Sequence, residues 1–130
     1  MMLTPEIALL VWAIALAVVQ MVIAVLGALQ QVGLATLIGN REGFPALPGW
    51  AGRADRAHRN MLQNLVLFAG LVLAAHSAGI SNDLTLLGAQ LFFWGRVAYA
   101  AVYLIGLPWV RTGVWAVSVL GLVLIFLQLV

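Results

Sequence analysis

Residues 52–69 read GRADRAHRNMLQNLVLFA, and they join three arginines, an aspartate, a histidine and three amides to an apolar run. After Gly52 no glycine or proline interrupts this segment, so it predicts one continuous helix. A polar stretch fused to a membrane-type helix is costly unless its polar groups have partners. We therefore expect the polar end of this helix to be a functional site, where its polar groups contact a partner.

The rest of the chain has the composition of an integral membrane protein. Of its 130 residues, 65% are hydrophobic and 8% are charged, against about 45–50% and about 25% in soluble domains. All six basic residues are arginine, and so small a basic set does not indicate nucleic-acid binding. The lack of cysteine excludes disulfides, thiolate metal sites and a cysteine nucleophile. We expect no metal.

Four segments are long and apolar enough to cross a bilayer, which takes about 20 residues. They cover residues 5–37, 52–78, 82–105 and 108–130. Pro5 and Pro108 stand where the first turn of a helix tolerates proline. Asn82 and its neighbours offer N-cap chemistry for the third segment. The sequence predicts an all-α fold, a membrane four-helix bundle that forms a single four-span domain over residues 1–130.

The charges predict an orientation in the membrane. The first segment lacks a basic leader and is too long for a cleaved signal, so we expect a retained anchor. Arginines gather around the first and third connections, whereas the second holds Asp83 and no arginine. By the positive-inside tendency, we expect the first and third connections in the cytoplasm and both termini outside.

Two polar stripes form when the helices are wound at about 3.6 residues per turn. Arg53, Arg56, Asn60 and Gln63 share one face of the second helix, with Asn64 at its edge. The polar side chains descend from the membrane boundary, so the last of them lie at hydrocarbon depth.

The second stripe is on the third helix, where Arg96, Tyr99 and Tyr103 share a face, and Arg111 follows at the start of the fourth helix. A guanidinium inside a membrane needs an anion, carbonyls or water. Apart from Asp55, and from Asp83 at the first turn of the third, no carboxylate lies inside the second to fourth spans. This deficit of counter-ions predicts a small polyanionic ligand or lipid headgroups as the partner.

Ordinary structural roles stay open for the same residues. Arginines at a membrane boundary most often meet lipid phosphates and set topology, which is the simplest role for Arg41, Arg59 and Arg111. Amides such as Asn60 commonly join membrane helices. Tyrosines commonly belong to the aromatic belts at the interfaces.

The run Arg56-Ala57-His58-Arg59-Asn60-Met61-Leu62-Gln63-Asn64, in a short chain with four spans, resembles the MAPEG family, the membrane-associated proteins of eicosanoid and glutathione metabolism. That family shows Arg-Ala-His/Gln-x-Asn-x-x-Glu, and the chain departs from this pattern at Gln63. Residues 95–104, with Arg96 seven residues before Tyr103, are similar to bacterial-type microsomal glutathione transferases. The turn before Arg111 resembles the approach to a functional arginine in that family.

The resemblance implies a homotrimer that binds glutathione as co-substrate between subunits, near the cytoplasmic side. It implies a transferase or peroxidase that joins the glutathione thiolate to lipophilic electrophiles drawn from membrane lipid. The catalytic roles would fall to Arg111 and Tyr103. The binding roles would fall to Arg56, Asn60, Gln63 and Arg96, and stripe geometry adds Arg53 and Tyr99.

Two other functions stay open. Gln63 cannot pair with the glutathione ammonium as a glutamate would, which favours a non-catalytic lipid-binding or scaffold protein of the same architecture. A small multidrug transporter also uses four short helices. It needs a carboxylate at depth, however, and the first segment has Gln20 there and Glu6 only at its rim.

Overall fold

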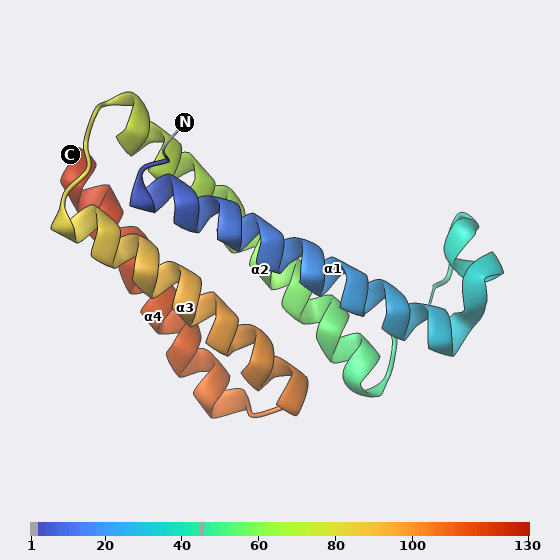
Figure 1. Cartoon of the computed structure of the whole chain (residues 1–130). Helices are drawn as coiled ribbons and strands as arrows, with labels where there is room; N and C mark the ends of the chain where they lie inside the picture. The colour runs from blue at the N-terminus through green and yellow to red at the C-terminus, as the bar shows by residue number, and fades with distance from the viewer. Residues whose placement is uncertain (1–2, 45) are drawn as a thin grey trace.

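In a computed structural model, which describes residues 3–44 and 46–130, the chain is all-helical. The helices of this described part are α1 (Pro5–Ile38), α2 (Gly49–Ser77), α3 (Asp83–Ile105) and α4 (Pro108–Leu129). Figure 1 shows them running lengthwise beside one another, with both termini and the α2–α3 connection at one end. The first and third connections lie at the opposite end, as four helices that alternate in direction require.

The predicted all-α membrane fold is confirmed, with one difference. Within the described residues, α1, α2 and α4 are long and apolar enough to cross a membrane, and the chain is an integral membrane protein. The sequence predicts four spans, but α3, which carries Gln90, Arg96 and two tyrosines, is not among these three. It packs against α1, α2 and α4, so much of its polar surface meets protein.

The helix starts follow the local signals. The Asn82 side chain accepts from the backbone N–H groups of Leu84 and Thr85, both at 2.9 Å. In return, the Thr85 hydroxyl accepts from the Asn82 N–H at 2.8 Å, which completes a capping box. α2 begins at Gly49, three residues before the predicted start at Gly52, because the chain enters the helix directly from extended Pro48.

α1 is longer than a bilayer is thick. The part before Gly33 alone spans about 40 Å, against a hydrocarbon core of about 30 Å. The helix bends at Gly33, whose φ of 80° and ψ of 165° fall where glycine is tolerated and side chains are not. Figure 1 shows the segment after the bend projecting past the start of α2.

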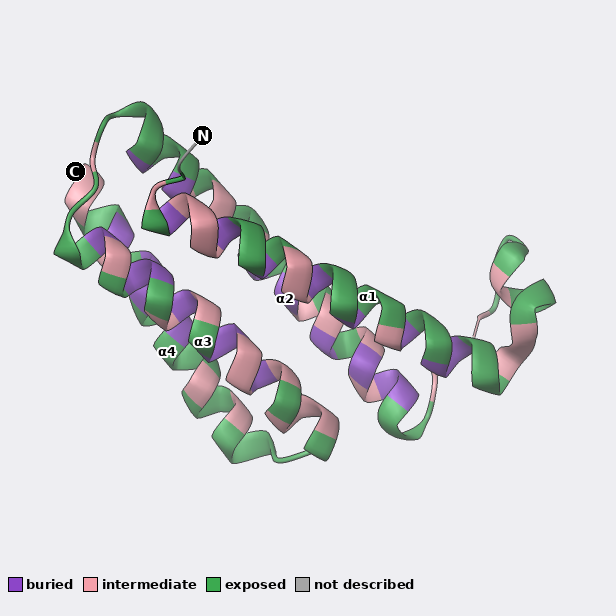
Figure 2. Ribbon diagram, viewed as in Figure 1, coloured by how far each residue is buried: buried purple, intermediate pink, exposed green. Residues whose placement is uncertain are grey.

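Apolar side chains join the helices at mid-bundle. The rings of Phe68 in α2 and Phe92 in α3 stack with centroids 4.1 Å apart, and both side chains are fully buried. Figure 2 shows buried residues recurring along the inner sides of the helices and exposed residues outside. Many exposed residues are large and apolar, Trp12, Val66 and Trp94 among them, as contact with lipid requires.

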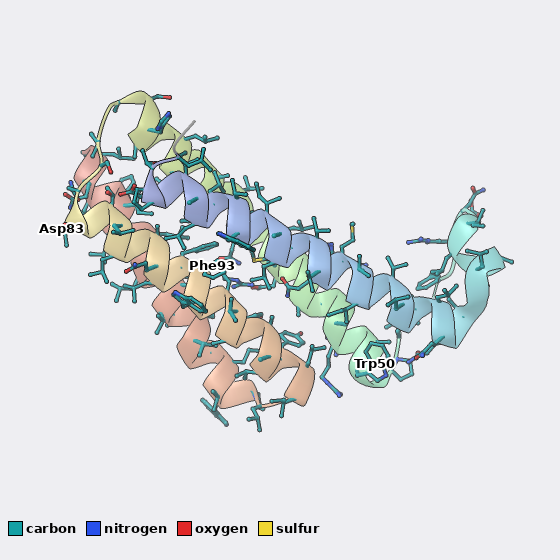
Figure 3. All side chains as sticks on the ribbon, in the orientation of Figure 1. Trp50, Asp83 and Phe93 are labelled. Atoms are coloured by element: carbon teal, nitrogen blue, oxygen red, sulfur yellow. The ribbon has the colours of Figure 1, made fainter. Side chains whose placement is uncertain are left out.

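The end that holds the termini is tied together by a buried carboxylate. Glu6 is 6% exposed, and it accepts hydrogen bonds from the hydroxyls of Thr85 at 2.8 Å and Ser81 at 3.1 Å. These bonds fasten the first turn of α1 to the first turn of α3. Figure 3 shows Asp83 at this end and Trp50 at the other, so the arginine-rich start of α2 lies far from Glu6.

Candidate functional site

The start of α2, the last turns of α3 and the start of α4 converge at the end opposite the termini. Contacts described below link six of the eight residues predicted for the site. Arg53 lies beside them, bonded to Leu104 of α3, and we call these seven residues the arginine site. Its members are Arg53, Arg56, Asn60, Arg96, Tyr99, Tyr103 and Arg111. The eighth residue, Gln63, lies exposed on α2.

Arg96 is the buried member of the arginine site, with 1% of its surface exposed. Its Nη2 donates to the Asn60 Oδ1 at 2.8 Å. Its Nε and Nη1 are buried and find no hydrogen-bond partner among the described residues. Buried polar groups in proteins are nearly always hydrogen-bonded, so the two nitrogens without a described partner make Arg96 a candidate ligand-binding residue.

Asn60 is held in place by Asn64, one turn further along α2. The Asn64 Nδ2 donates to the Asn60 carbonyl oxygen at 2.8 Å and to its Oδ1 at 3.2 Å. The Asn60 Oδ1 therefore accepts from both an arginine and an amide. Sequence reasoning placed Asn64 only at the edge of the stripe, yet it is buried and makes these bonds. Its spacing of four residues from Asn60 was the available signal.

The ring of Tyr99 supports the other side of Arg96. The guanidinium carbon lies 4.2 Å from the ring centroid, within the range of a cation–π contact. Tyr99 in turn lies 5.6 Å from Tyr103, measured between ring centroids. The two tyrosines thus connect the buried arginine to the more exposed part of the arginine site.

Tyr103 stands between two arginines. The Arg56 Nε donates to its hydroxyl at 3.1 Å, and the Arg111 guanidinium carbon lies 4.3 Å from its ring centroid. Because the hydroxyl oxygen accepts the bond from Arg56, its own proton stays available for donation. The arrangement offers a hydrogen-bond donor flanked by positive charge.

Arg53 closes the C-terminal end of α3. Its Nε donates to the carbonyl oxygen of Leu104 at 3.0 Å. The last four carbonyls of a helix lack partners within the helix, and a cation is favourable at that negative end. The sequence predicts that Arg53 binds the ligand, whereas in the structure its Nε donates to a backbone carbonyl of α3.

A close backbone approach shapes the loop beside these arginines. The carbonyl oxygen of Leu47 packs against the Cα of Gly52, where any side chain would overlap it. The same space is bounded by the Arg56 guanidinium, whose Nη1 would lie 3.1 Å from an added methyl group. Gly52 therefore lets the connection fold back over the start of α2.

The arginines of the site are paired with neutral groups. Their partners are an amide, a hydroxyl, a backbone carbonyl and the faces of two tyrosines. Across residues 3–44 and 46–130, the one salt bridge joins Arg59 to Asp55 at 3.1 Å, on an exposed surface. The Asp55 carboxylate is thus engaged with Arg59, and the arginine site keeps a net positive charge that suits an anion.

A comparison with protein-family models identifies the family of the chain. The chain matches the model of the MAPEG family over residues 9–130, which takes in most of α1 and all of α2, α3 and α4. No curated protein and no solved structure matches it significantly. The family match covers far more than half of the chain, and the chain belongs to the MAPEG family, which includes glutathione transferases and related membrane proteins.

Proposed function

We propose that the protein is a membrane glutathione transferase whose arginine site binds glutathione and activates its thiol. The observation that carries the proposal is the buried guanidinium of Arg96, which among the described residues has a single neutral hydrogen-bond partner and two nitrogens without one. An uncompensated buried cation is strongly unfavourable. An anionic ligand that enters from the aqueous side relieves this cost.

Glutathione fits because it carries two carboxylates. An arginine fork binds a carboxylate through two parallel hydrogen bonds, and a lysine cannot reproduce that geometry. Arg96 and Arg56 are the proposed carboxylate partners, with Asn60 and Tyr99 holding Arg96 in position. Arg53 adds positive charge at the edge, although its Nε is already used by Leu104.

Arg111 and Tyr103 are the proposed catalytic groups. A free thiol has a pKa of about 8.5, and a neighbouring cation lowers it. Arg111 provides the cation, and the Tyr103 hydroxyl donates a hydrogen bond to the thiolate. The thiol proton leaves to water, and the sulfur attacks the electrophilic carbon to form a C–S bond. The leaving group departs with the bonding electron pair.

A neighbouring copy of the chain would complete the site. Arg56 and Gln63 are exposed on a single protomer, and neither of the two recesses described in this protein is lined by an arginine. A second protomer packed on this side would enclose the ligand, in line with the proposed homotrimer. The proposed orientation puts the arginine site in the cytoplasmic half of the bilayer, where the positive-inside tendency places arginines.

One observation favours a non-catalytic alternative. Gln63 replaces the family glutamate with a neutral amide, so it cannot neutralise the glutathione ammonium. A protein that binds anionic lipid headgroups needs no such carboxylate. In that case the arginine site holds a lipid phosphate, and the chain acts as a lipid-binding or scaffold protein.

Thiol conjugation by the purified protein in detergent tests the proposal. Glutathione and chlorodinitrobenzene serve as substrates, and the conjugate is followed by absorbance. We expect activity that falls at least tenfold in Arg96→Gln and in Arg111→Gln. Arg59→Gln is the matched control, because Arg59 lies on the same helix as Arg56 but is bound to Asp55, and it should retain activity. Full activity in both site variants, or none in the folded wild type, overturns the proposal.

A further inference from the structure

A small recess lies between α1, α2 and α3, and no member of the arginine site is among its lining residues. It has a volume of about 90 Å³ and is partly open. Its walls include Leu16 and Ile23 of α1, Ala57 of α2, and Ala101 and Leu104 of α3. Gln20 is the one polar side chain among its lining residues, and the others are leucine, isoleucine, valine and alanine.

Gln20 is 7% exposed, and within the described part of the chain its Oε1 has no hydrogen-bond partner. An amide at depth in a membrane helix is costly without a partner. Most amides of this kind join two helices, but Gln20 faces apolar neighbours across the recess. Gln20 therefore supplies the one amide on the wall of the recess with which a polar guest can pair.

Water is a poor occupant of this recess. A buried water usually makes about three hydrogen bonds and needs at least two polar partners. The recess offers one amide, and the remaining walls are apolar. A molecule with an apolar body and one hydrogen-bonding group satisfies both the amide and the walls.

We propose that this recess binds a small membrane-dissolved molecule whose apolar body carries a hydroxyl group that pairs with Gln20. A hydroxyl both donates and accepts, so it matches the amide in either orientation. The volume is below that of the engineered cavity of about 150 Å³ that holds benzene. The recess therefore takes a chain end or one edge of a ring, and the rest of the guest extends through the open side into the bilayer.

The proposed site is separate from the arginine site in its residues. Ala57 and Leu104 follow Arg56 and Tyr103 in the chain but line the recess facing α1. No member of the arginine site lines it. The inference therefore stands whether or not glutathione binds, and its test uses no glutathione.

Fluorine NMR of two matched probes in detergent micelles tests the inference. The probes are para-fluorophenol and para-fluorotoluene, which share a ring and differ in the hydroxyl. Partition into protein-free micelles is subtracted. We expect the wild type to favour the phenol by about five- to tenfold, the equivalent of one ordinary hydrogen bond. Gln20→Leu should remove this preference and leave toluene binding unchanged.

Two further variants keep the test decisive. Gln30→Leu alters an exposed glutamine of the same helix and should bind both probes as the wild type does. Ala101→Leu adds bulk to the wall of the recess and should weaken the binding of both probes. This variant tests the location of the site even if Gln20→Leu does not fold. Equal binding of the two probes by the wild type, or an unchanged preference in folded Gln20→Leu, overturns the inference. So does undiminished binding in folded Ala101→Leu.

Discussion

Arg96 Nη2 lies 2.8 Å from the Oδ1 atom of Asn60, and this contact joins the buried cation of α3 to the polar stripe of α2. The partner is an amide and carries no charge. The bond orients the guanidinium without neutralising it, so its positive charge is retained for a ligand. We therefore expect glutathione binding to depend on Arg96 having a neutral partner, Asn60, instead of a carboxylate.

Replacement of Asn60 tests the contact itself. Asn60→Ala leaves the Arg96 guanidinium without its described hydrogen-bond partner, and a bond to a charged group contributes about 1.5–3 kcal/mol. We expect the free energy of unfolding to fall by about 2 kcal/mol, measured by thermal or denaturant unfolding in detergent. Asn60→Asp supplies a carboxylate of similar shape and should retain stability. A stable Asn60→Ala protein would show that the contact contributes little.

The hydroxyl of Tyr103 is expected to act in the chemical step. Tyr103→Phe keeps the ring that Arg111 contacts but removes the proposed donor to the thiolate. We expect kcat to fall roughly ten- to hundredfold, the range of one hydrogen bond to a charged group, with a smaller change in KM for glutathione. Tyr99→Phe is the matched control, since the described contacts of Tyr99 involve its ring. Equal losses in the two variants would argue against a special role for the Tyr103 hydroxyl.

Gln63→Glu restores the carboxylate that the family pattern carries. The position is exposed, and exposed ion pairs contribute about 0.2–1 kcal/mol, so we expect glutathione affinity to rise by no more than about fivefold. Calorimetric titration measures the change, with Gln63→Leu as a control that adds no charge. Weaker binding in the glutamate variant would mean that Gln63 does not lie near the ammonium of the ligand.

Gly52 is expected to tolerate no side chain. In Gly52→Ala the added methyl group overlaps the Leu47 carbonyl, and overpacking of this kind costs about 1–3 kcal/mol. Gly113→Ala is the control, because a methyl group there meets no atom within 4 Å, and alanine is the better helix former. The melting temperature should therefore fall in Gly52→Ala and rise in Gly113→Ala. A Gly52→Ala protein as stable as the wild type would show that the loop shifts at no cost.

The sequence was sufficient for the helices because their signals are local. Long apolar runs, a proline in the first turn of α1 and of α4, and the Asn82 cap fixed the ends of most elements to within a residue or so. The start of α2 was missed by three residues because it depends on how the chain leaves Pro48. α3 is not among the helices long and apolar enough to cross a membrane, and it carries the polar residues Arg96, Tyr99 and Tyr103 of the arginine site.

The site was predictable only in part. Helical spacing placed Arg96, Tyr99 and Tyr103 on one face, and the structure links them as expected. Spacing within one helix cannot show which neighbour a side chain meets on another helix. The bonds from Arg53 to Leu104 and from Arg96 to Asn60 depend on how α2 and α3 pack. For the same reason, helical spacing could not show that Asn64 is buried or that a recess lies beside Gln20.

Calorimetric titration of glutathione into the purified protein tests the central claim most directly. We expect measurable binding to the wild type, at least tenfold weaker binding to folded Arg96→Gln, and unchanged binding to Arg59→Gln. No heat from a folded wild-type protein, or equal affinity in the wild type and Arg96→Gln, would contradict the claim that the buried guanidinium binds glutathione.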